Sequence, residues 1–346
     1  DPKTGTISSL KDKELNLELI DQNSKWKFGQ FIYELLDNRA QMESKRLDNF
    51  TREAPDSVWF ESYETGQVWN TFRFKANTRA ANRAGSLIIE FRIFNCTKRI
   101  DIAYLIEKKL LTDPEGIYIA FPFALENGQL AFDVAGGEIR AGIDQIPGSA
   151  NDWNTVQSYA RLSNPIAQII LCSPEIPLMQ FGGINTGRYT AGAKPESTHI
   201  FGWPMNNYWT TNFNANQHGG TAWTYTISSS KKPEMQEAAR FGSENRTPLL
   251  TRVLPGGGKG NDVWEKSLIS GWNDNLLLIS TFPDEDGKSA VFQLREISGK
   301  PATIRLQNNL TGKVFPCKQV DVTGQTVQDG NLEIKPFETK FIHVEF

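Results

Sequence analysis

Cysteine and histidine are scarce in this chain, with three of each among 346 residues. Cys96, Cys172 and Cys317 lie far apart and form no Cys-x-x-Cys pair, which argues against a disulfide framework or a thiolate zinc site. We expect buried free thiols, although the sequence leaves one disulfide open. No His-x-x-x-His or His-x-Asp spacing exists, so we predict no metal site in this chain and ordinary structural or surface roles for its histidines, His199, His218 and His343.

The chain also lacks an excess of positive charge and a long apolar run. Its formal net charge is −3, so no basic surface favours nucleic acid or an anionic membrane. No apolar run approaches the roughly 20 residues that a membrane helix needs. There is no Gly-x-Ser-x-Gly motif, and the glycine-rich run 255–260 lacks the spacing of a phosphate loop. We therefore predict no nucleic-acid partner and no membrane partner.

The compartment stays open at this stage. The chain begins Asp1-Pro2 without a signal-like segment, as a mature product or a cut piece would. Asn-x-Thr sequons matter only in a eukaryotic secretory setting, and they begin at Asn49, Asn95, Asn245 and Asn309. We favour the periplasm or the secretory pathway.

Aromatic residues and glycines are plentiful. Nine tryptophans, 21 phenylalanines and 28 glycines are typical of aromatic-rich strands joined by tight turns. Alternating apolar and polar residues predict strands, for example at 69–74 and 87–94. The run 117–125 is nearly all apolar, so both of its faces should be buried. Helical patterns are predicted at 31–42 and 233–242.

The spacing of strands and turns changes after about Ser267. From there the strands are short and are separated by glycine, aspartate and asparagine turns. We predict an all-β fold with a large antiparallel β-sandwich over residues 1–266 and a small C-terminal β-sandwich over residues 267–346.

The stretch 203–217 combines aromatic rings and carboxamides with almost no charge. In a strand, side chains alternate between two faces, so the rings would lie on one side and the amides on the other. We expect the rings of Trp203, Tyr208, Trp209 and Phe213 to fill the core. Carboxamides match hydroxyl groups because they both donate and accept hydrogen bonds, so we expect sugar contacts from the amides of Asn206, Asn207 and Asn212.

Three motifs resemble the β-rich C-terminal half of glycoside hydrolase family 38, the zinc-dependent α-mannosidases. They are Trp-x-Met-Asn-Asn-Tyr-Trp-x-Thr-Asn-Phe at 203–213, Asp-Pro-x-Thr-Gly-x-Ile-x-Ser-Leu at 1–10 and Tyr-x-Ala-Phe-Pro-Phe at 118–123. The resemblance implies a β-supersandwich of the galactose mutarotase-like type. It also implies a carbohydrate partner, a mannoside, and a catalytic domain upstream that holds the zinc ligands and the nucleophilic aspartate, so we expect no cofactor in this chain.

Candidate site residues come from two loops. Asp144 and Asp152 share a polar loop and form the one carboxyl pair we nominate for a metal-free glycosidase, but we favour a role for them in capping or tethering the loop. Trp153 and Gln157 follow in the same region. With Asn206, Asn207, Trp209 and Asn212 they complete the predicted substrate-binding set.

Two alternatives to a glycosidase β region remain. A stand-alone carbohydrate-binding module would use Trp153, Trp203 or Trp209 as a stacking platform. A mutarotase-like epimerase would need a clustered histidine and glutamate, which three scattered histidines do not favour.

Overall fold

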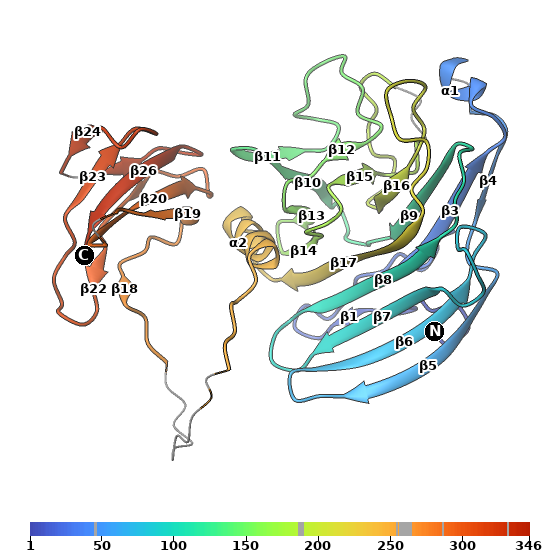
Figure 1. Cartoon of the computed structure of the whole chain (residues 1–346), viewed down its shortest axis with the longest axis horizontal. Coiled ribbons are helices and arrows are strands. Elements are labelled where there is room, and N and C mark those ends of the chain that lie inside the picture. The colour runs from blue at the N-terminus through green and yellow to red at the C-terminus, as the bar shows by residue number, and fades with distance from the viewer. Residues whose placement is uncertain (45–46, 186–189, 254, 256–264, 286, 331) are drawn as a thin grey trace. The chain divides into compact units, whose positions relative to one another are not determined.

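The computed structural model describes residues 1–346 except 45–46, 186–189, 254, 256–264, 286 and 331. It contains two compact units (Figure 1). The large unit comprises Asp1–Val134, Glu138–Pro233 and Phe241–Arg246; the small unit comprises Ala135–Gly137, Glu234–Arg240 and Thr247–Phe346. None of the described helices is long and apolar enough to cross a membrane.

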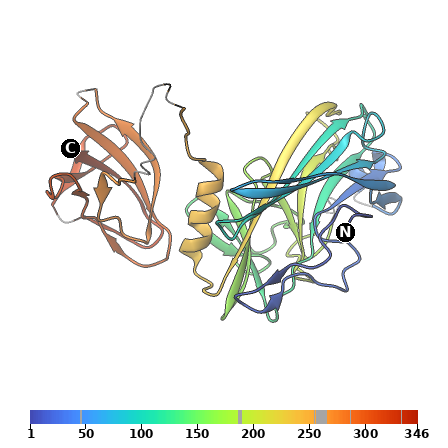
Figure 2. The ribbon, with the colours of Figure 1, turned by 90° about the horizontal axis from the view of Figure 1, so that it is seen from below.

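A nine-stranded sheet forms one layer of the large unit, and every register recorded within it is antiparallel. The long strand β17 can be followed in yellow in Figure 2. In spatial order the strands are β11 (Gly137–Arg140), β10 (Gln129–Val134), β13 (Tyr159–Asn164), β14 (Ala167–Cys172), β17 (Gly219–Ser230), β8 (Ile100–Lys108), β7 (Leu87–Phe94), β6 (Trp69–Asn77) and β5 (Ser57–Thr65).

A six-stranded sheet forms the second layer. Its order is β12 (Asn154–Thr155), β15 (Leu178–Phe181), β16 (Ile200–Asn206), β9 (Glu115–Phe121), β3 (Gln30–Leu36) and β4 (Phe50–Glu53). A small hairpin of β1 (Lys11–Asp12) and β2 (Leu17–Glu18) lies near the N-terminus, and the short helix α1 covers Ala40–Ser44.

Alternation along the strands builds the main core between the two sheets. Ile117, Ile119 and Phe121 of β9 point into it. Tyr118 and Ala120 point the other way and join a second buried cluster on the far face of the six-stranded sheet. All seven residues of β9 are buried, which confirms the prediction that this segment is covered on both sides.

The small unit has its own core. A five-stranded sheet follows the order β19 (Leu276–Pro283), β20 (Ser289–Glu296), β26 (Thr339–Glu345), β23 (Cys317–Val320) and β24 (Thr326–Asp329). Two further ladders pair β18 (Ile269–Ser270) with β22 (Gln307–Asn308) and β21 (Ala302–Thr303) with β25 (Glu333–Ile334). Phe292, Ile334 and Ile342 are among the residues that meet in its interior.

The all-β fold, with a large antiparallel supersandwich and a small β-sandwich, is therefore as predicted. The helix predicted at 233–242 is present as α2 (Met235–Arg246). The helix predicted at 31–42 is wrong, because most of that segment is strand β3 and only α1 is helical. β3 is buried on both faces, so its alternation is hidden in the sequence.

The cysteines are free, but Cys96 is exposed and only Cys172 is fully buried.

Candidate functional site

An aromatic cluster covers the face of the six-stranded sheet that points away from the main core. Tyr118 of β9 and Trp203 of β16 stack with ring centroids 5.8 Å apart. Trp153 meets Trp203 edge to face at 5.7 Å, and Trp209 meets Trp153 edge to face at 5.9 Å. Trp203 is 2% exposed and Trp209 is 38% exposed, so this row of indoles runs from the interior to the surface.

A buried carboxylate anchors the inner end of the cluster. Glu34 of β3 has no exposed surface, and its Oε1 accepts hydrogen bonds from the hydroxyls of Tyr118 at 3.1 Å and Tyr208 at 2.7 Å. Arg52 of β4 donates from Nε to Glu34 Oε2 at 2.6 Å. Burial, with Tyr118 and Glu34 nearby, raises the pKa of Tyr208, so its hydroxyl remains a donor. Because Glu34 is enclosed and paired, it holds the cluster together and does not face solvent as an acid or base.

Asn207 closes the base of the loop that follows β16. The residue is 2% exposed. Its Oδ1 accepts a hydrogen bond from the N–H of Glu115 at 2.6 Å. Its Nδ2 donates to the carbonyls of Asp113 at 2.8 Å and Ala215 at 2.9 Å. A single amide therefore fastens both ends of the segment 207–215 to the start of β9, and it does so from the interior.

Arg39 fastens the same loop from a distant segment of the chain. Its Nη1 donates to the carbonyls of Asn207 at 2.8 Å and Trp209 at 2.6 Å, and its Nη2 donates to the carbonyl of Thr112 at 2.6 Å. The guanidinium also lies over the ring of Phe213, 4.9 Å from the centroid. These contacts fix the backbone on either side of Trp209.

Unmatched polar atoms occur at the end of β16, just before this loop. Nε1 of Trp203 and Oδ1 of Asn206 are both buried atoms with no hydrogen-bond partner among the described residues. Asn212, near the loop tip, is exposed and has a φ of 54°, a left-handed conformation in which asparagine is enriched. Unpaired buried polar groups are rare in native proteins, and they often mark a place where water or a ligand completes the bonding.

Two residues, Trp209 and Asn207, differ in burial from what the sequence predicts. Trp203 and Tyr208 are buried as predicted, but Trp209 is exposed and Asn207 lies in the interior. The reason is that β16 ends at Asn206, after an irregularity in register between Gly202 and Met205. Beyond Asn206 the alternation of a strand no longer decides which side chains are buried.

The two predicted carboxylates occupy very different environments. Asp144 is exposed and forms an ion pair with Arg140 at 2.7 Å; hydrogen bonds from Arg140 lower the pKa of Asp144 to about 2. Asp152 is 1% exposed, and its Oδ2 accepts a hydrogen bond from the N–H of Thr190 at 2.8 Å. Its Oδ1 has no partner in the part of the chain that the structure describes. The pair therefore does not present two carboxyl groups to solvent.

Of the remaining candidates, the structure brings Trp153 together with Trp209 but places Gln157 elsewhere. The Gln157 side chain is exposed, and its backbone carbonyl accepts a hydrogen bond from Arg246 of α2.

Two histidines pair with aspartates at 2.9 Å, His199 with Asp21 and His343 with Asp284. Within the described ranges no group of three or more histidine, cysteine, aspartate or glutamate side chains could hold a metal ion.

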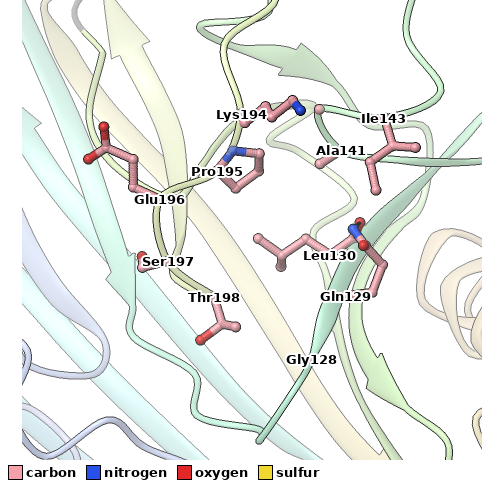
Figure 3. A pocket seen from close by; sticks show the side chains of 11 residues that line it. Gly128, Gln129, Leu130, Ala141, Ile143, Lys194, Pro195, Glu196, Ser197 and Thr198 are labelled. Carbon is pink, nitrogen blue, oxygen red and sulfur yellow. Dashed lines mark hydrogen bonds between the residues drawn. The ribbon is translucent and has the colours of Figure 1, made fainter.

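A separate pocket of about 340 Å³ lies between β10, the turn 141–143 and the segment 194–198. Figure 3 shows Leu130 and Pro195 at its middle, with the carboxylate of Glu196 turned away from them. The hydroxyls of Ser197 and Thr198 already donate to the carbonyls of Gly182 and Phe123. None of the predicted site residues lines this pocket, and its free polar groups do not converge.

No family model matches the sequence, and no curated protein matches it. Solved structures do. An α-mannosidase from Enterococcus faecalis V583 aligns with 98% of this chain at a TM-score of 0.66 and 10% identity. A protein of glycosyl hydrolase family 38 from Enterococcus faecalis aligns with 98% at a TM-score of 0.68 and 10% identity. The chain shares its fold with part of each. It spans only 40% and 41% of the length of those two proteins.

Sequence reasoning missed Glu34 and Arg39, which organise the cluster and the loop. Both lie in the segment predicted to be helical, and neither is among the candidate site residues. The partners of Arg39 are backbone carbonyls at positions 112, 207 and 209, and no local pattern signals such contacts.

Proposed function

We propose that this chain is the β-rich, non-catalytic region of a family 38-type glycosidase that acts on α-mannosides. The observation that carries the proposal is the alignment of nearly the whole chain with part of two proteins, an α-mannosidase and a protein of glycosyl hydrolase family 38. The motif at 203–213, found independently in the sequence, supports the same assignment.

In this proposal a separate catalytic domain, upstream in the complete enzyme, holds the zinc and the nucleophile. The present chain braces that domain and contributes the edge formed by its 144–157 and 206–212 loops to the sugar pocket. The environments of Asp144 and Asp152 agree with a supporting role, because one is tied to Arg140 and the other is enclosed.

The test is release of a chromogenic aglycone from an aryl α-mannoside by the purified chain, with and without added zinc. We expect no turnover in either condition. The matched variants are Asp144→Asn and Asp152→Asn. Turnover that survives purification and is lost in either variant would show that the chain is itself a glycosidase. A reading frame upstream of Asp1 that encodes a domain with a His-x-Asp motif is the second expected result.

A stand-alone carbohydrate-binding module is the second candidate, and the exposure of Trp209 favours it. It predicts a signal peptide directly upstream of Asp1 in place of a catalytic domain.

A further inference from the structure

We propose that Trp209 is a stacking platform for a neutral pyranose ring, held by the loop 207–215 and braced by Trp153. The identity of the sugar, an α-mannoside, rests on the proposed function. The platform itself follows from the geometry of the loop.

The exposure of Trp209 is imposed by its surroundings. Asn207 ties the two ends of the loop to β9, and Arg39 holds the carbonyl of Trp209 itself. The T-shaped contact with Trp153, at 5.9 Å and 82°, braces the indole, while 38% of the residue remains exposed. A ring fixed in this way loses little conformational entropy when a ligand binds, which is the condition for an effective stacking surface.

Two other exposed tryptophans, Trp59 and Trp69, have different neighbours. Trp59 is 39% exposed and pairs in register with Lys75, which is bonded to Glu61. Trp69 is 40% exposed and packs on Phe94. The guanidinium of Arg99 lies over the ring of Phe94. Each of these indoles therefore has charged side chains among its neighbours, whereas Arg39, which contacts the Trp209 loop, is bonded to backbone carbonyls.

The surroundings of Trp209 are polar but uncharged along the chain. It is followed by Thr210, Thr211 and Asn212, all of them exposed. The nearby guanidinium of Arg39 donates to backbone carbonyls. An apolar ring framed by hydroxyl and amide groups suits a ligand that has one apolar face and a rim of neutral hydroxyls, which describes a pyranose.

The unmatched atoms of β16 add a second, independent observation. Trp203 Nε1 can only donate and Asn206 Oδ1 can only accept. Neither has a partner in the described chain, although both atoms are buried. Trp203 and Asn206 precede Trp209 by six and three residues in the sequence. Because both atoms are enclosed, we expect a bound water molecule to complete their hydrogen bonding when a sugar is stacked on Trp209.

The experiment is a titration of the intact chain, labelled with ¹⁵N at its indole nitrogens, with methyl α-mannoside and with an α-linked mannobiose. NMR follows the indole N–H signals, which are assigned by single substitutions. We expect a saturable shift of the Trp209 signal. Trp209→Phe should weaken binding and Trp209→Ala should weaken it about tenfold or more. Trp69→Ala, at a tryptophan of equal exposure, should leave the affinity unchanged.

Two results would overturn the proposal. One is the absence of a saturable Trp209 shift in the wild-type chain, whose preformed loop needs no partner to bind. The other is an equal loss of affinity in Trp69→Ala. The decisive measurement is the shift of the Trp209 signal in the wild-type chain. The test therefore remains valid even if a variant folds poorly. Catalytic inactivity of the chain is measured separately, so failure of the proposed function and failure of the platform give different results.

Discussion

Lys108 Nζ and Glu115 Oε1 lie 2.7 Å apart in the interior of the large unit, with side chains only 1% and 2% exposed. Lys108 belongs to β8 of the nine-stranded sheet and Glu115 to β9 of the six-stranded sheet, so the ion pair joins the two layers. The hydroxyl of Tyr33 donates to Glu115 Oε2 at 2.6 Å, and the ammonium of Lys108 also donates to its neighbour's carbonyl at 2.6 Å. Both charges are thus enclosed, and each has a hydrogen-bond partner besides the other.

Breaking this pair on one side should be costly. Lys108→Met leaves the Glu115 carboxylate buried without its cation and should lower the free energy of unfolding by about 3–5 kcal/mol. Lys75→Met removes a partly exposed partner of Glu61 and should cost at most about 1 kcal/mol. Urea unfolding of both variants checks the prediction, and equal costs would contradict it.

Asn207 should matter more for stability than its small side chain suggests. Asn207→Ala leaves the N–H of Glu115 and two carbonyls without partners, and should cost about 1–3 kcal/mol. Asn214→Ala, at an exposed position of the same loop, should stay within about 0.5 kcal/mol of wild type. Thermal melts compare the two. An Asn207 variant as stable as the Asn214 control would show that the clamp is unimportant.

Trp209→Ala should be milder than a core truncation. A fully buried tryptophan costs about 3–5 kcal/mol when it is replaced by alanine. Trp209 is 38% exposed, so part of its surface already contacts water and the cost should fall below that range. Trp203 is 2% exposed, so Trp203→Ala should show the whole loss in the free energy of unfolding that truncating a buried tryptophan causes. Chemical denaturation of the two variants should rank Trp203→Ala as clearly the more damaging.

The N-terminal hairpin should loosen in acid. Burial alone would raise the pKa of Asp12, but hydrogen bonds from Lys98, Ser229 and the N–H of Leu15 outweigh it and lower the pKa. The stabilisation is therefore present above the unfolded pKa of about 3.9 and is lost as pH falls through the lower folded value. Hydrogen exchange of residues 10–20 should rise in that window.

The matched variant is Asp12→Asn, which should loosen the hairpin at neutral pH and remove the acid dependence. Asp321→Asn alters an exposed carboxylate in the small unit whose pKa is also lowered, by hydrogen bonds from Thr323 and Gln325, and should leave the hairpin unchanged. An acid transition that persists in Asp12→Asn would assign the effect to another group.

Residues 1–266 should fold without the rest of the chain. The prediction rests on the change in strand spacing near Ser267 and on separate buried clusters in the two parts. A chain ending at 266 should be soluble and should melt cooperatively, because it keeps both large sheets. Complete insolubility of the truncated protein would place the boundary elsewhere.

Much of the fold could be predicted because strands leave a period of two in the sequence. The segments around β6 and β7 show it, and β9 is recognisable from its uninterrupted apolar run. β3 was misread because Phe31, Ile32 and Tyr33 are all buried, so nothing alternates. The candidate site was harder to predict, because the backbone carbonyls that Arg39 binds lie 73, 168 and 170 residues away along the chain.

Asn207 and Arg39 secure the 207–215 loop through backbone groups. The stability of the β-sandwich therefore depends little on which side chains stand between those two anchors. Substitutions at exposed positions such as Thr210, Thr211 and Asn214 should therefore leave the fold intact. Evolution could alter the chemistry displayed at this edge by substitutions there, while the scaffold and its folding remain the same.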